Sequence, residues 1–298
     1  MVTPGNEPSR ARTALRGLLR RAGIRRPGSA RATIAYLEDK RAAQSLTIAD
    51  LRAQRARLSE TIAGQAAELE RVRAAADVAS GRDRPDLSYL FVVTYGRSGS
   101  TLLQGILSST PGVVIRGENG AALNHLFHFH DKASRSRYRL TRSYPLPERH
   151  SWWGIDGYRA DTALRNMRQL VLETLLRPAP DTRVVGFKEI YWMPDRMQEF
   201  LEFMQQLFPG ARFVFNTRDL SEVAKSRWWA RKPDAEQELQ QLEKQYAEAL
   251  DFFGDAVFRV HYNDYIADPS ALRPLFDWLG EEFDEDRVRA VMEIRHSY

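Results

Sequence analysis

The clearest chemistry in the sequence lies in a short run of glycine, hydroxyl and arginine side chains. It reads Thr94-Tyr95-Gly96-Arg97-Ser98-Gly99-Ser100-Thr101. An apolar run of strand type, YLFVVTY, leads into it, and a helical pattern follows. Glycine lets the backbone turn tightly, and the free N–H groups at a helix start attract an anion. We therefore predict a phosphate-binding loop; the simpler alternative is a strand-to-helix turn with Ser and Thr caps. The predicted ligand-binding residues are Gly96, Arg97, Ser98, Gly99, Ser100 and Thr101.

This loop differs from the Walker A loop of ATP-binding proteins. That loop needs a lysine directly before its Ser or Thr, and none stands here. The later strand that would supply an aspartate for Mg²⁺ ends instead in Asn216-Thr217-Arg218-Asp219. Both departures disfavour an ATP-dependent kinase, which stays as the alternative enzyme class.

A second candidate anion site combines Arg218 with Ser226, eight residues later. We expect Arg218 at the carboxyl end of a strand over residues 211–216 and Ser226 on a helix over residues 220–230. The reversal from strand to helix would fold Ser226 back over Arg218, so that both grip a second phosphate. If each residue is considered on its own, the simpler interpretation is that Arg218 pairs with a nearby acid and that Ser226 faces solvent.

The composition excludes several classes of protein. The 298 residues suffice for one large domain or two smaller ones, and 43% hydrophobic with 28% charged residues is typical of a soluble globular protein. No apolar run is long enough for a transmembrane helix, and residues 1–30 lack a secretory signal pattern, so we expect a cytoplasmic location. The absence of cysteine excludes disulfides and thiolate catalysis.

The positive net charge of +5 belongs to the N-terminal segment. Residues 1–31 hold eight arginines and one acid, whereas residues 86–298 hold 27 basic and 30 acidic side chains. We therefore expect no binding of nucleic acid by the body of the chain. Residues 1–30 are expected to form a disordered basic arm, with weak contact to an acidic membrane as the alternative role.

A long helix is expected over residues 31–79, which contain no proline. With Ile34 at position a of a heptad, eight of the twelve core positions are apolar, which is typical of a coiled coil. We expect a homodimer through this helix; the alternative is a helix packed on its own body. The core positions are Ile34, Leu37, Arg41, Gln44, Ile48, Leu51, Arg55, Leu58, Ile62, Gln65, Leu69 and Val72.

Beyond a linker at residues 80–86, residues 87–298 alternate strand and helix patterns. The expected strands cover residues 89–95, 113–115, 183–187, 211–216 and 258–262. The expected helices cover residues 102–108, 195–207, 220–230, 236–253, 271–279 and 284–294. This order predicts an α/β domain, a parallel sheet with helices on both faces. Residues 131–160 are polar, aromatic and irregular, and we expect an insertion or lid over the carboxyl edge of the sheet.

The two anion motifs together resemble the sulfotransferases that use 3′-phosphoadenosine 5′-phosphosulfate (PAPS). The resemblance covers residues 89–280 and includes the loop after the first strand and Arg218 with Ser226. The stretch Arg259–Asp264, the following Asp268-Pro269 and the helix end Trp278-Leu279-Gly280 are also similar to the family pattern. One departure is the chain end, Arg295-His296-Ser297-Tyr298, which lacks the Arg-Lys-Gly clamp of the cytosolic branch.

The resemblance implies a P-loop-like fold, PAPS as co-substrate, no metal, and transfer to a hydroxyl acceptor. The loop is closer to the carbohydrate and protein-tyrosine branches and their bacterial relatives than to the branch that acts on small phenols. A carbohydrate acceptor is therefore favoured, with a peptide tyrosine as the alternative. A third hypothesis is a coiled-coil scaffold with an inactive body, which the intact motifs oppose.

The resemblance also assigns roles to single residues. It places Arg97 at the leaving phosphate, Lys188 at the transferring group and Glu118 as the base, with Glu189 as the alternative base. It places Tyr262 at the adenine.

Other chemistry-bearing side chains have simpler interpretations. His125, His128 and His130 invite a zinc site, but only the first two share a helical face and no acidic ligand pattern accompanies them. Two tryptophan pairs can stack on a sugar or adenine, although aromatic clusters are more often core. These are Trp152 with Trp153 and Trp228 with Trp229.

Overall fold

The computed structural model describes residues 27–79, 84, 86–141 and 146–294. The chain divides into two compact units, Met1–Ser80 and Gly81–Tyr298, and each is described by itself. Most of the predicted basic arm and of the linker, and the chain end that lacks the arginine-lysine-glycine clamp, lie outside the described residues.

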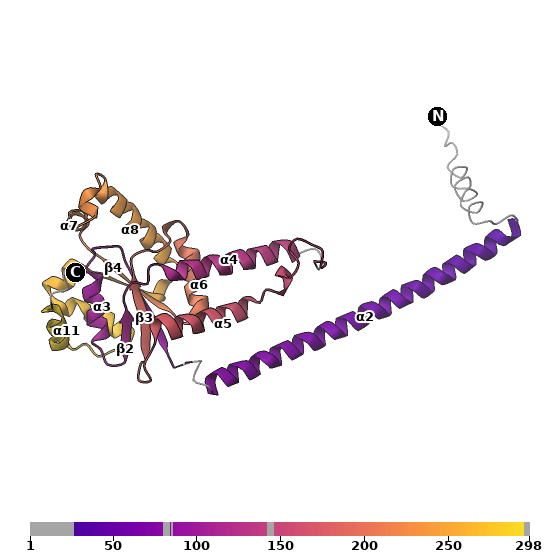
Figure 1. The fold of residues 1–298 in the computed structure, drawn as a ribbon, viewed down its shortest axis with the longest axis horizontal. Helices are drawn as coiled ribbons and strands as arrows, with labels where there is room; N and C mark the ends of the chain where they lie inside the picture. The colour runs from indigo at the N-terminus through magenta and orange to yellow at the C-terminus, as the bar shows by residue number, and fades with distance from the viewer. Residues whose placement is uncertain (1–26, 80–83, 85, 142–145, 295–298) are drawn as a thin grey trace, which may run out of the picture. The chain divides into compact units, whose positions relative to one another are not determined.

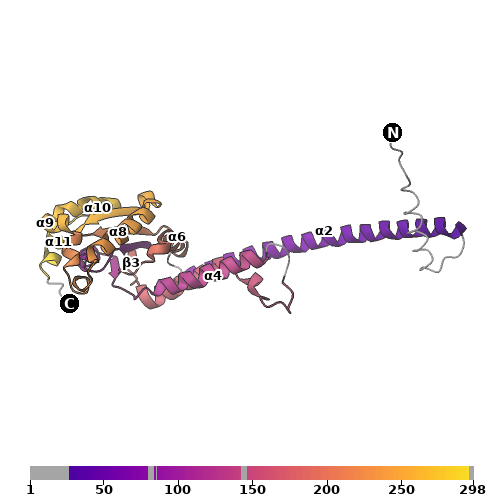
Figure 2. The same ribbon diagram turned by 90° about the horizontal axis from the view of Figure 1, so that it is seen from above.

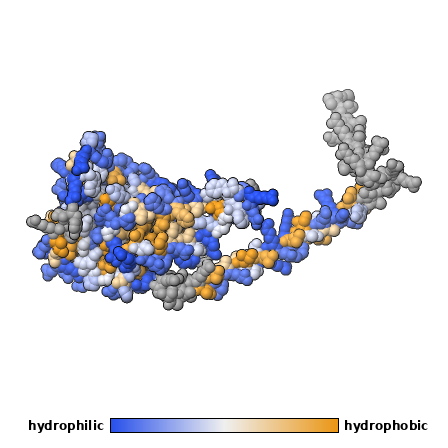
Figure 3. Space-filling view, viewed as in Figure 1, coloured by the Kyte–Doolittle hydropathy of each residue, from blue (hydrophilic) through white to orange (hydrophobic). Residues whose placement is uncertain are grey.

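The described part of the first unit is one long helix, α2, which runs from Pro27 to Ala79 over 53 residues (Figure 1). Apolar side chains recur along it (Figure 3). Within the unit these side chains are solvent-exposed, for example Leu58 at 63% and Ile62 at 65%. The helix was predicted; its pairing with a second copy stays a prediction.

The second unit is built on a five-stranded parallel sheet with strand order β2-β3-β1-β4-β5. The strands are β1 Ser88–Val93, β2 Val113–Arg116, β3 Val184–Glu189, β4 Arg212–Thr217 and β5 Val257–His261. The central strand β1 is buried from Tyr89 onward, as its unbroken apolar run predicts. The prediction of an α/β domain is confirmed.

Helices cover both faces of this sheet (Figures 1 and 2). The longer ones are α3 Ser100–Ser108, α4 Ala122–Thr141, α5 Ala160–Val171, α6 Met197–Leu207, α8 Ala235–Asp251 and α11 Glu285–Met292. The shorter ones are α7 Leu220–Ala224, α9 Tyr262–Ala267 and α10 Arg273–Leu279. One apolar core joins a sheet face to α4, α5, α6 and α8, and a second joins the other face to α3, α9, α10 and α11. None of the helices described is long and apolar enough to span a membrane.

A glycine in β3 allows this strand to lie close to β1. A Cβ atom on Gly186 would lie 1.6 Å from the carbonyl oxygen of Leu90, so no other residue fits there without a shift of the backbone. The register places Lys188 of β3 beside Val92 of β1. Lys188 therefore lies at the carboxyl edge of the sheet, where α/β folds bind ligands.

Two expectations about helices are wrong. Residues 131–160 are not irregular throughout, because α4 extends from Ala122 to Thr141, next to α5 (Figure 1). The helix expected over residues 220–230 ends at Ala224. Arg227 adopts a left-handed φ of 47°, and Trp229 donates its indole N–H to the carbonyl oxygen of Gly96, which pulls the chain off the helical path.

Candidate active site

The loop between β1 and α3 has the geometry of an anion-binding turn. Arg97 and Gly99 adopt left-handed φ angles of 73° and 80°. Gly99 is the N-cap of α3, and no side chain caps the helix there. The first N–H groups of α3, at Ser100 and Thr101, are therefore left for a ligand.

Buried hydrogen bonds hold this loop from beneath. Thr94 Oγ1 lies 2.6 Å from Ser98 Oγ and 2.7 Å from the carbonyl oxygen of Asn216. The side-chain amide of Asn216 donates to the Ser98 carbonyl, and its oxygen accepts from the Tyr265 hydroxyl at 3.0 Å. Ser98 is fully buried, so its hydroxyl holds the loop together and does not face a ligand.

Tyr95 fixes the position of the Arg218 backbone. Its hydroxyl accepts a hydrogen bond from Arg218 N at 3.0 Å and donates one to Glu243 Oε2 at 2.6 Å. Burial and the Glu243 carboxylate raise the pKa of Tyr95 far above its ordinary value, so the hydroxyl keeps its proton. Tyr95 thereby joins β1, the end of β4 and α8 at the base of the site.

The two predicted anion sites meet in the structure. Arg97 donates from Nε to Ser226 Oγ at 3.0 Å, and Arg218 Nη1 lies 3.4 Å from the Arg97 carbonyl oxygen. Ser226 lies two residues beyond α7 rather than on a helix, but it still folds back onto the loop.

Arg218 is held by an acid and by an aromatic ring. Its guanidinium donates two hydrogen bonds to Glu222 Oε2, at 3.0 and 2.7 Å, and lies 4.5 Å from the ring centroid of Tyr262. The same ring packs on the loop, because a Cβ atom on Gly99 would lie 2.1 Å from Tyr262 Cδ2. The predicted residues Arg97, Gly99, Arg218, Ser226 and Tyr262 therefore form one cluster.

Lys188 and Glu118 form a second cluster at the same edge of the sheet. Lys188 Nζ donates to Glu118 Oε1 at 2.5 Å. The lysine side chain is 6% exposed and the glutamate side chain is 40% exposed. Among the described residues, no hydrogen bond reaches Glu118 Oε2, so this oxygen is open to solvent or a ligand. No described contact joins this pair to Arg97.

Glu189 has a structural role. Its carboxylate accepts four backbone hydrogen bonds, from Asn119, Ala121, Ile190 and Tyr191. It is 3% exposed, and these bonds tie the end of β3 to the segment that enters α4. This use of both oxygens speaks against Glu189 as the base.

Three residues that the sequence did not single out for the site, and Trp228, which it considered only for stacking, also contribute. Tyr95 and Asn216 support the loop from strand ends, and Glu222 accepts hydrogen bonds from the Arg218 guanidinium. Trp228, 41% exposed, packs on Gly96, where a Cβ atom would lie 2.4 Å from its ring. Of these residues, only Glu222 could have been identified from its position in the sequence, because it lies one helical turn after Arg218.

Comparisons with known proteins bear on this geometry. A model described as "Sulfotransferase family" matches residues 90–285. Similar solved structures include the sulfotransferase domain of the Synechococcus PCC 7002 olefin synthase, at 20% identity, TM-score 0.46, and coverage of 72% of this chain and 80% of that one. Another is sulfotransferase STF9 from Mycobacterium avium, at 15% identity, TM-score 0.40, and coverage of 74% and 71%. No curated protein matches the chain.

The family match includes the loop, Glu118, Lys188, Arg218, Ser226 and Tyr262. It spans 196 of the 298 residues, that is, most of the second unit. The chain therefore belongs to the sulfotransferase family and is a transferase enzyme.

Proposed function

We propose that this enzyme transfers a sulfuryl group from PAPS to a hydroxyl group of a carbohydrate. The observation that carries the proposal is the contact of Arg97 with Ser226 beside Arg218. It puts two cationic anion-binding groups side by side at the carboxyl edge of the sheet. PAPS carries two anionic groups, a 5′-phosphosulfate and a 3′-phosphate, on one ribose.

The residues of the first cluster fit these two groups. Arg97 and the first N–H groups of α3 would hold the 5′-phosphosulfate, as helix starts hold phosphates. Arg218 and Ser226 would hold the 3′-phosphate, with Glu222 moving off the guanidinium. Tyr262 would contact the adenine from its place beside Arg218.

The second cluster would carry the chemistry. Glu118 would take the proton of the acceptor hydroxyl. The oxygen of that hydroxyl would then bond to sulfur, while the bond from sulfur to the phosphate oxygen of PAPS breaks. Lys188 and Arg97 would stabilise the negative charge that develops on the sulfuryl and leaving phosphate oxygens. Their hydrogen bond takes up one ammonium N–H group and Oε1 of the carboxylate, so the other two N–H groups of Lys188 and Glu118 Oε2 would be left for these roles.

A direct binding experiment tests this proposal. Isothermal titration calorimetry with adenosine 3′,5′-bisphosphate in EDTA should show one site per chain, whereas ATP with Mg²⁺ should bind far more weakly. Radiolabelled sulfur from PAPS should then reach a saccharide hydroxyl. Tight ATP binding that needs Mg²⁺, with no binding of the bisphosphate, would favour the kinase alternative and contradict the proposal.

A further inference from the structure

One face of α4 presents a row of basic side chains. His125, His128, Lys132 and Arg139 are all exposed, and Ser136 lies between the last two. Successive residues of an α-helix are rotated by about 100°, so these five positions fall within about 80° of arc. We call this row the α4 stripe.

The stripe faces away from the packed side of the helix. The buried positions Leu123, Phe127 and His130 lie on the opposite side of α4. His130 is not part of the stripe: it is buried, its burial lowers its pKa, and its Nδ1 lies 2.9 Å from the Tyr158 hydroxyl.

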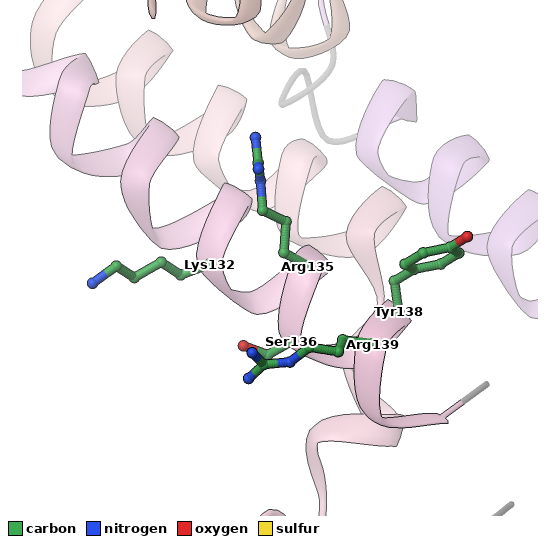
Figure 4. Close-up of a pocket in the computed structure, with 5 residues that line it drawn as sticks. All are labelled: Lys132, Arg135, Ser136, Tyr138 and Arg139. Atoms are coloured by element: carbon green, nitrogen blue, oxygen red, sulfur yellow. The ribbon is translucent and has the colours of Figure 1, made fainter. Parts of the chain in front are cut away.

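The charge of the stripe is not balanced by nearby acids. The only carboxylate of α4, Asp131, forms ion pairs with Arg135 and Arg196 instead. Figure 4 shows the side chains of Lys132, Ser136 and Arg139 pointing to one side of α4, with Arg135 turned to another. The same residues line a surface pocket together with Tyr138. Among the described residues, neither Lys132 nor Arg139 has an ion-pair partner.

The α4 stripe differs in charge from the rest of the second unit. Helix α4 carries four Lys or Arg, of which Lys132 and Arg139 belong to the stripe, and one Asp, whereas residues 86–298 as a whole carry three more acidic than basic side chains. A helix C-terminus favours cations only within its last turn, and the stripe extends over four turns. Self-stabilisation of the helix therefore accounts for Arg139, which lies in the last turn, but not for Lys132.

The stripe begins seven residues after the proposed base in the chain, and the helix leads away from that point. Helix α4 starts four residues after Glu118, and Asn119 caps it by accepting from Ala122 N at 2.9 Å. From His125 to Arg139 the helix axis covers about 21 Å, at 1.5 Å per residue. An acceptor that reaches both Glu118 and Arg139 must be a chain of several sugar units.

We infer that the α4 stripe binds an acidic polysaccharide, whose carboxylate or sulfate groups pair with Lys132 and Arg139 while one hydroxyl lies at Glu118. This inference rests on the proposed function and names its acceptor class. Binding by the stripe adds affinity for long anionic chains and none for short or neutral ones. Because the contacts are exposed, added salt weakens them.

The test measures binding to the full chain saturated with adenosine 3′,5′-bisphosphate. The probes are octagalacturonate, digalacturonate and maltooctaose, measured by calorimetry. Octagalacturonate should bind much more tightly than the other two. The double variant K132Q/R139Q should weaken its binding at least about tenfold, because it loses two charged hydrogen-bond donors.

The double variant K244Q/R289Q is the matched control, since it removes two exposed cations from α8 and α11. It should bind octagalacturonate as the unmodified chain does, although the basic residues 1–31 add a background that both variants share. Equal losses in the two variants, or no binding of octagalacturonate by a chain that binds the bisphosphate, would overturn the inference and leave the proposed function standing. Release of K132Q/R139Q from phosphatidylserine vesicles with unchanged octagalacturonate binding would overturn it in favour of a lipid surface. Failure to bind the bisphosphate would contradict the proposed function itself.

Discussion

Arg97 and Ser226, 129 positions apart in the sequence, are joined by a hydrogen bond of 3.0 Å from Nε to Oγ. The contact closes the loop after β1 against the turn after α7, and Tyr95 holds the intervening backbone of Arg218. Two motifs that are each weak on their own thus become one cluster of donors. Substitutions at single members of this cluster should separate their contributions.

Glu222→Gln should strengthen the binding of adenosine 3′,5′-bisphosphate. The Glu222 carboxylate accepts two hydrogen bonds from Arg218 and must give way to a phosphate. An exposed ion pair is worth about 0.2–1 kcal/mol, so we expect affinity to rise by up to about fivefold. Calorimetry measures the change.

The control for this variant is Glu248→Gln, which removes an exposed carboxylate paired with Lys244 elsewhere on the surface. Its affinity for the bisphosphate should not change. Weaker binding by Glu222→Gln would show instead that the carboxylate is needed to hold Arg218 for the ligand.

Gly96→Ala and Gly99→Ala should both weaken nucleotide binding, but only the first should be rescued. The three atoms nearest to a Cβ atom on Gly96 all belong to the ring of Trp228, and the φ of Gly96 is not left-handed, so Gly96→Ala combined with Trp228→Ala should bind as Trp228→Ala does. Gly99 has a φ of 80°, which costs about 1–2 kcal/mol for other residues even after Tyr262→Ala clears the space. Calorimetry and melting temperatures of these variants check this contrast, and rescue of Gly99→Ala by Tyr262→Ala would contradict it.

Glu118→Gln should separate chemistry from binding. The amide oxygen can still accept from Lys188, but it has no basicity, so kcat should fall by about 10²–10⁴ while bisphosphate affinity stays nearly constant. The measurement is single-turnover transfer from PAPS to a saccharide acceptor.

Glu189→Gln is the paired control for the base. Its carboxylate accepts four backbone hydrogen bonds, so this variant should lower the melting temperature and leave the kcat of the folded fraction largely intact. The reverse pattern, with transfer lost in Glu189→Gln and kept in Glu118→Gln, would exchange the two roles.

The exposed heptad of α2 predicts a dimer in solution. Light scattering of the full chain should give twice the monomer mass of 34.2 kDa. Leu58→Lys with Ile62→Lys should give monomers, because both substitutions put charge at core positions. Leu46→Lys, at an equally exposed position outside the core, should stay dimeric. A monomeric full chain would contradict the prediction.

The sequence predicted the sheet mainly because its central strands are largely apolar runs, and a run such as YLFVVTY has few other structures open to it. It also predicted that Ser226 folds back toward Arg218 after the end of a strand, but it did not predict the hydrogen bond of Ser226 to Arg97. The helix α4 escaped notice because only Leu123, Phe127 and His130 are buried along its 20 residues, too few for an apolar period.

The sequence could not predict the contacts between distant segments. The four N–H groups that occupy Glu189 come partly from Asn119 and Ala121, about 70 residues before it, and nothing local marks this carboxylate as structural. Likewise, the pairing of Tyr95 with Glu243 depends on how α8 packs beside β1.

The most direct test of the proposed function compares two nucleotides on two proteins. Calorimetry should be run with adenosine 3′,5′-bisphosphate and with 5′-AMP, which lacks the 3′-phosphate, on the full chain and on Arg218→Ala. Losing a charged hydrogen bond costs about 1.5–3 kcal/mol, so Arg218→Ala should bind the bisphosphate about ten- to 150-fold more weakly and 5′-AMP nearly as before. Equal losses for both nucleotides, or none for either, would contradict a 3′-phosphate site at Arg218.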